Sequence, residues 1–106
     1  MKKALRLLAA VLLLVQVVLA GEESKHNYKP KPGYVPDAET AIKIAVAIWE
    51  PIYGKKLIAG EKPYVAELTN GIWTVQGSLP KNTVGGVAIA EISKDDGKIW
   101  RVSHGQ

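Results

Sequence analysis

The fold is decided by residues 64–77, which read YVAELTNGIWTVQG. Asn70 and Gly71 are a strong hairpin signal, because both positions of a tight two-residue turn favour positive φ. The residues on either side alternate between apolar and polar side chains, as in strands that bury one face. This turn pairs Thr69 with Ile72 and continues outward in register. The expected inner face holds Tyr64, Ala66, Leu68, Trp73 and Val75, and the opposite side of the hairpin carries Val65, Glu67, Ile72, Thr74 and Gln76.

A second hairpin is predicted around residues 95–97, Asp-Asp-Gly, as a three-residue loop with glycine in the left-handed position. It pairs Glu91 with Arg101 and Ile92 with Trp100, which sets opposite charges together and an aromatic ring against an aliphatic side chain. A register shifted by one residue loses this pairing. We therefore expect the Trp100 ring on the inner face. The other expected pairs are Ser93 with Ile99, Ala90 with Val102 and Ala88 with His104.

A helix is predicted to begin after Asp37, whose side chain can accept hydrogen bonds from the free amides of the first turn. Two apolar stripes follow at helical spacing, and Pro51 ends or kinks the helix after Glu50. The stripes are Ala41, Ala45, Ile48 and Ile52 beside Ile42, Val46 and Trp49. The predicted fold class is α+β, with an N-terminal helix packed on a four-stranded antiparallel sheet, a roll of the cystatin-like or nuclear-transport-factor-2-like type.

Residues 1–20 are typical of a secretory signal peptide. Lys2, Lys3 and Arg6 precede an apolar stretch of 14 residues that ends at the small residue Ala20. A membrane-spanning helix needs roughly 20 such residues, so we expect cleavage after Ala20 and no stable membrane anchor afterwards. The chain is therefore expected in the bacterial periplasm or in the secreted fraction.

The rest of the chain divides into two parts. Residues 21–36 are rich in proline and lysine and are expected to form a flexible tether, because they contain too few apolar side chains to fold alone. Residues 37–106 are expected to form a single α+β binding domain. The net charge of the whole chain is +4, but without the three basic residues of the leader it falls to +1. This small charge, with Trp73 and Trp100 expected in the core, argues against a nucleic-acid partner.

Several segments together resemble a known family. In order they read WEPIYGKK at 49–56, KPY at 62–64, GIWTVQGSLP at 71–80, GGVAIAEI at 85–92, DGKI at 96–99 and VSHG at 102–105. Their order and spacing resemble the bacterial immunity proteins with a nuclear-transport-factor-2 fold, which are encoded in polymorphic-toxin loci. The resemblance covers about residues 37–106. It implies a non-catalytic protein that binds a cognate protein toxin and blocks it, with no catalytic motif to carry over.

The chain lacks the side chains that several kinds of metal site and catalytic site need. The chain has no cysteine and only two histidines, His26 and His104, so we expect no metal site, no cofactor and no thiol catalysis. His104 is interpreted as a partly buried, hydrogen-bonded histidine. An isomerase-like enzyme remains an alternative, since it needs a carboxylate and a phenol in an apolar pocket. The available groups of these types are Glu50, Tyr53, Tyr64 and Glu67.

The face of the sheet opposite the helix, which we call the outer face, is the predicted partner-binding surface. It mixes branched aliphatic and polar side chains, where a face left to water is usually more polar. The predicted contact residues are Val65, Glu67, Ile72, Thr74, Gln76, Ile89, Glu91, Ile99 and Arg101. An edge strand and the connection Ser78–Gly86 stay open as other contact sites, as does a homodimer. A cystatin-like binding or protease-inhibitor module is the alternative function.

Overall fold

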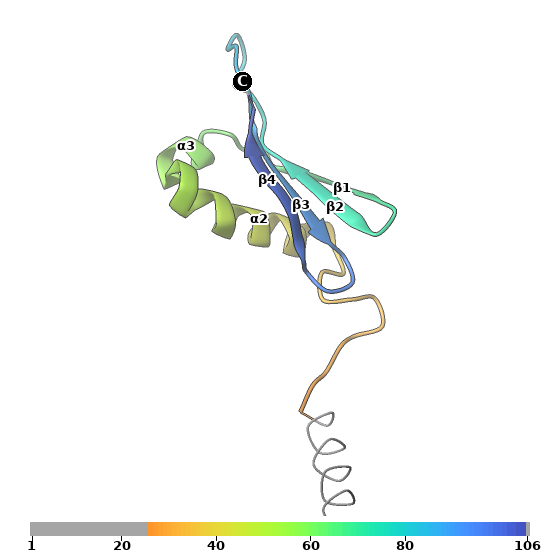
Figure 1. The fold of residues 1–106 in the computed structure, drawn as a ribbon. Helices are drawn as coiled ribbons and strands as arrows, with labels where there is room; N and C mark the ends of the chain where they lie inside the picture. The colour runs from red at the N-terminus through yellow and green to blue at the C-terminus, as the bar shows by residue number, and fades with distance from the viewer. Residues whose placement is uncertain (1–25, 106) are drawn as a thin grey trace, which may run out of the picture.

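A long helix packs on one face of a four-stranded antiparallel sheet in the computed structural model (Figure 1). The structure describes residues 26–105, so the predicted signal peptide lies outside the described residues. The elements are α2 (Ala38–Tyr53), α3 (Lys55–Ala59), β1 (Val65–Thr69), β2 (Ile72–Gln76), β3 (Ala88–Ser93) and β4 (Ile99–His104). The strands are ordered β1-β2-β3-β4. The predicted fold class is confirmed. Within residues 26–105, no helix combines the length and apolarity needed to cross a membrane.

Helix α2 begins where the sequence predicts. The Asp37 side chain caps it by accepting a 2.8 Å hydrogen bond from the Thr40 amide. The helix does not stop at Glu50, however, but runs through Pro51 to its end at Gly54, where φ is +98°. Proline removes one amide donor, and the ladder resumes when the Gly54 amide donates to the Glu50 carbonyl at 2.9 Å. The side chains buried against the sheet are Ala41, Ala45 and Trp49.

The first hairpin has the predicted register from Val65–Gln76 to Thr69–Ile72. Trp73 lies on the inner face, where its ring nitrogen donates a 2.8 Å hydrogen bond to the carbonyl of Val35. Trp73 joins a core shared by α2, β2 and β3, in which the central strands contribute small or branched side chains. The buried sheet residues are Trp73, Val75, Ala88, Ala90 and Ile92.

The second hairpin differs from the prediction at its loop end. Glu91 pairs with Arg101 as expected, but Ile92 pairs with Ile99 and Trp100 is an extra residue in β4. This is a β-bulge, which inserts one residue and re-aims the side chains beside it. The predicted pairs of Ile92 with Trp100 and Ser93 with Ile99 are therefore wrong. Trp100 turns to the outer face and stays 57% exposed.

The segment before the helix is packed on the domain. Residues 29–36, which we call the strap, lie against the β3–β4 loop. The Val35 amide donates to the Lys94 carbonyl at 3.0 Å, the Tyr34 amide donates to the Asp95 carbonyl at 2.9 Å, and the Val35 side chain is only 1% exposed. The predicted tether over residues 21–36 is thus corrected for its last part. Val35 anchors this part, because its side chain belongs to the buried core and its carbonyl accepts the hydrogen bond from the Trp73 ring nitrogen.

Candidate functional site

The outer face of the sheet carries most of the predicted contact residues. The strand pairings place Glu67, Thr74 and Glu91 in one row across β1, β2 and β3. Arg101 on β4 continues this row, because it pairs with Glu91. In another row of the same face Gln76 pairs with Ile89. Helix α2 contacts β1, β2 and β3 on the opposite, inner side of the sheet, so it leaves this surface uncovered (Figure 1).

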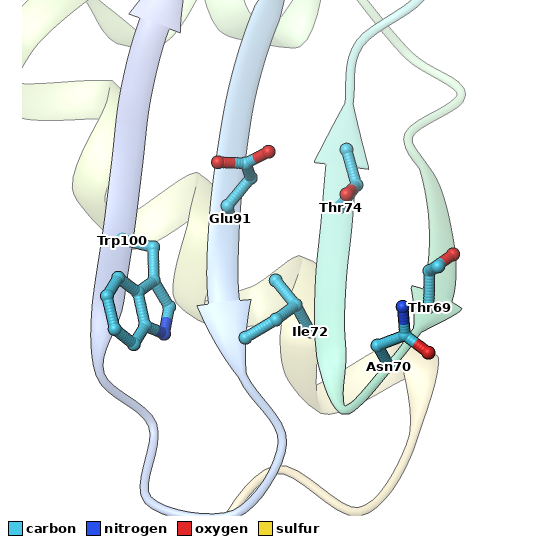
Figure 2. Close-up of a pocket in the computed structure, with 6 residues that line it drawn as sticks. All are labelled: Thr69, Asn70, Ile72, Thr74, Glu91 and Trp100. Atoms are coloured by element: carbon cyan, nitrogen blue, oxygen red, sulfur yellow. The ribbon is translucent and has the colours of Figure 1, made fainter.

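A shallow hollow of about 650 Å³ lies on the outer face near the hairpin turns. Figure 2 shows its lining, with the Trp100 ring at one side and the β1–β2 turn at the other. The lining residues are Thr69, Asn70, Ile72, Thr74, Glu91 and Trp100. We call this the Trp100 hollow. It combines one large aromatic surface with hydroxyl, amide and carboxylate groups, which is the mixture found at protein contact sites.

The Trp100 ring also contacts a cation of its own hairpin. The Lys98 ammonium nitrogen lies 4.0 Å from the ring centroid. A cation at this distance is attracted by the π electrons of the indole and restrains the ring. The ring is therefore held on the outer face while more than half of its surface remains open to a partner.

A second, smaller depression of about 70 Å³ continues along the same face. Its lining residues are Val65, Glu67, Thr74 and Gln76, all of them predicted contact residues. Thr74 lines both hollows, so the two form one continuous surface across β1, β2 and β3.

One predicted contact residue lies elsewhere. Ile99 pairs directly with the buried Ile92, so it belongs to the inner side of the sheet and not to the outer face. The bulge causes this correction, because it exchanges the sides expected for Ile99 and Trp100. Sequence reasoning also missed Thr69 and Asn70, which line the Trp100 hollow. The alternation of the first hairpin could have found Thr69, since it shares a side with Glu67.

The opposite side of the molecule holds one buried carboxylate, that of Glu61, which is 6% exposed. One of its oxygens, Oε1, accepts a 2.8 Å hydrogen bond from the Ala88 amide. The other, Oε2, lies 2.7 Å from Nε2 of His104. The His104 ring packs against Tyr53, with 5.2 Å between the ring centroids. His104 is thus partly buried and hydrogen-bonded, as the sequence predicts.

This cluster bears on the enzyme alternative. A general base needs a carboxylate oxygen free to face a substrate, but both oxygens of Glu61 are engaged within the fold. The nearby Tyr64 hydroxyl donates to the Ile58 carbonyl at 2.8 Å. Its pKa is raised by burial first, and then by the negative charges of Glu50 and Glu61. Glu67 lies on the outer face, apart from this cluster. Glu61 and Tyr64 therefore serve structural hydrogen bonds, and Glu67 is not brought together with them. Among residues 26–105, no cluster of histidine and acidic side chains is placed to hold a metal ion.

The sequence of the chain matches a known protein family. A model of the NTF2 fold immunity protein family matches residues 40–106, from the first turn of α2 through β4. The chain belongs to this family. Immunity proteins of this family are typically non-enzymatic and bind cognate toxins. The predicted resemblance is therefore confirmed.

Two relatives from Escherichia coli K12 are also similar to this immunity protein. The uncharacterized protein YhhH is 35% identical over 86 residues, which cover 79% of this chain and 66% of YhhH. The uncharacterized protein YbbC is 35% identical over 65 residues, which cover 60% of this chain and 53% of YbbC. The chain thus spans just under two thirds of the first relative and about half of the second. No solved structure matches it.

Proposed function

We propose that this immunity protein neutralises a cognate toxin by occlusion, with the outer face of its sheet docked on the toxin surface. The observation that carries the proposal is the exposed Trp100 ring beside the Trp100 hollow on a face that α2 leaves uncovered. Exposed aromatic rings in such settings are frequent centres of binding energy, because they exclude much water on contact.

The distribution of polar groups supports the same surface. Ile72 supplies apolar area near the middle of the hollow and Trp100 supplies it at one side, while Thr69, Asn70 and Glu91 add hydrogen-bonding groups around Ile72 (Figure 2). Protein interfaces combine an apolar centre with a polar rim in this way. The strands that carry these side chains are joined by continuous ladders, so the surface is preformed and little conformational entropy is lost on binding.

The proposed compartment is the periplasm or the exterior of the cell. The basic start and the apolar stretch of residues 1–20 support this, since a toxin delivered there must be met there. The chain also contains no cysteine, so its stability does not depend on the redox state of the compartment.

A rescue assay tests the function. Cells would express the toxin-like gene nearest to this gene in its genome, with the toxin directed to the periplasm, together with the full chain or a chain without residues 1–20. We expect protection by the full chain and its loss without the leader. Trp100→Ala should abolish protection at low expression. Ile52→Ala, which changes a 58% exposed side chain on α2, is the matched control and should protect fully.

Two results would contradict the proposal. Full protection by Trp100→Ala combined with Glu91→Ala would exclude the outer face as the contact surface. Growth arrest despite abundant, folded protein in the periplasm, made from the chain with its leader, would exclude toxin neutralisation itself.

A further inference from the structure

The connection between β2 and β3 projects beyond the end of the sheet (Figure 1). Within residues 78–87, which we call the finger, the Val84 side chain is fully exposed and Leu79 is 45% exposed. Lys81 is the one charged residue in the finger sequence. The finger therefore presents two apolar side chains beyond the sheet, and their burial against a partner would be favourable.

One residue holds both ends of this finger. The backbone carbonyl of Glu61 accepts a 2.7 Å hydrogen bond from the Ser78 amide, where the finger begins. The side-chain Oε1 of Glu61 accepts a 2.8 Å hydrogen bond from the Ala88 amide, where the finger ends. The same carboxylate is fixed from a third direction by His104 on β4. We call this arrangement the Glu61 clamp.

The residue at position 77 leaves room for the Glu61 clamp. A Cβ atom at Gly77 would lie only 2.5 Å from Oε1 of Glu61, so only glycine leaves room for the carboxylate at this position. The Gly77 amide in turn donates to the Ala88 carbonyl at 2.9 Å, which closes the base of the finger. A buried carboxylate is costly unless its oxygens are paired. A fully paired one therefore fixes its neighbours strongly.

The finger has internal order as well. Thr83 turns back on Pro80, whose carbonyl accepts from the Thr83 hydroxyl at 2.5 Å and from its amide at 3.2 Å. The Ser78 hydroxyl donates to the Pro63 carbonyl at 2.6 Å. A projecting loop ordered at its base and near its tip can bind without losing much conformational entropy. Loops held by a rigid scaffold commonly carry binding function.

We propose that the finger is a second toxin-contacting element, which inserts Leu79 and Val84 into an apolar cleft of the toxin. The cleft should carry acidic side chains at its rim, because Lys81 is the finger's one charge and is positive. Glu61 is a positioning residue for this contact, since it sets the finger's base without reaching its tip. This inference rests on the proposed function and adds a contact at the end of the sheet to the one on its outer face.

The first test changes the tip. Leu79→Asn and Val84→Asn should together raise the Kd for the toxin found in the rescue assay by about tenfold or more, with the melting temperature unchanged. Ile52→Asn is the control, because it replaces another exposed aliphatic side chain, on α2, and should leave Kd unchanged. Lys81→Glu should slow association and reduce its dependence on salt.

The second test changes the clamp. Glu61→Ala should speed hydrogen exchange of the Ala88 amide by about tenfold or more, while the Ala90 amide inside β3 exchanges as before. It should also slow association with the toxin, because fewer molecules then hold the finger in its binding shape. Glu61→Gln keeps an acceptor for the Ala88 amide and should restore much of both values. A purely structural role would lower the melting temperature of Glu61→Ala and leave the association rate of the folded protein unchanged.

The outcomes separate the two proposals. If the tip variants bind the toxin within twofold of the unchanged chain while Trp100→Ala binds weakly, the finger is not a contact and the outer face is. If the tip variants bind weakly and Trp100→Ala binds normally, the finger is the contact and the outer face is not. If the full chain neutralises no toxin, the proposed function and this inference fail together.

Discussion

Trp73 and Trp100 show how two residues of one kind take opposite roles. Trp73 is 8% exposed and donates to the Val35 carbonyl, so it is a centre of the core. Trp100 is 57% exposed and is held by Lys98 on the outer face. The environment of each ring, and not its chemistry, decides whether it stabilises the fold or presents a surface.

This contrast predicts different effects on stability. Trp73→Ala should lower the free energy of unfolding by about 3–5 kcal/mol, because it leaves a large cavity and an unpaired carbonyl. Trp100→Ala should lower it by less than about 1 kcal/mol, since the ring is mostly in solvent. Urea denaturation followed by circular dichroism measures both. Equal losses for the two variants would contradict the assignment of their sides.

Asp37 gives a residue-scale prediction about pH. Its pKa is lowered, first by the Thr40 hydroxyl and then by the Thr40 amide, which both donate to the carboxylate. A carboxyl with a lowered pKa in the folded state stabilises the fold above its ordinary pKa of 3.8, and this contribution is lost as the pH falls through the folded value. Asp37→Ala should therefore melt lower at about pH 7 and nearly match the unchanged chain at about pH 2. A constant difference in melting temperature across this range would show that the carboxylate charge is irrelevant to the cap.

At the scale of elements, local signals predicted the fold well. Asp37 and the Asn70–Gly71 turn each act within a few residues of themselves, and the start of α2 and the whole first hairpin follow them. The register of the second hairpin was harder to predict, because its loop sequence fits two registers. The backbone closes from the Ser93 amide to the Lys98 carbonyl at 2.8 Å, one residue away from the expected pairing, and the bulge at Trp100 restores the register.

The Glu61 clamp could not be predicted from local sequence. Its carboxylate meets Ala88 and His104, which are 27 and 43 residues away in the chain. No short sequence pattern around Glu61 predicts contacts between residues so far apart in the chain. Tertiary contacts of this kind appear only once α3, β3 and β4 are placed together. The sequence therefore predicts that His104 is partly buried and hydrogen-bonded, but it does not predict that Glu61 is the partner.

The close passage of Gly77 beneath Glu61 supports an element-scale prediction. Gly77→Ala should destabilise the domain by about 1–3 kcal/mol, because the new methyl group must displace the carboxylate from the Ala88 amide. Gly105→Ala is the control, since a Cβ there meets nothing within 4 Å. Thermal and urea denaturation of both variants measure the difference. Equal stability of the two would mean that the carboxylate moves aside at little cost.

At the scale of the whole molecule, the chain before α2 completes the core. The strap lies over the loop between β3 and β4, and it brings Val35 onto Trp73 from outside the predicted domain. A single helix cannot cover the whole inner face of four strands. The strap closes the end of that face which α2 leaves open, and the outer face is left free for a partner.

A chain that begins at Asp37 should therefore be less stable than one that begins at Gly21. Burial of the Val35 side chain and the hydrogen bonds of its backbone are together worth about 2–4 kcal/mol. The exposed pair of Lys29 and Asp95 adds little, because water screens both charges. Val35→Ala in the longer chain should reproduce a large part of the loss, whereas Lys29→Ala should not. The free energies of unfolding of the four chains decide the matter. If the shorter chain is as stable as the longer one, the strap is a tether after all, and α2 alone suffices to bury Trp73.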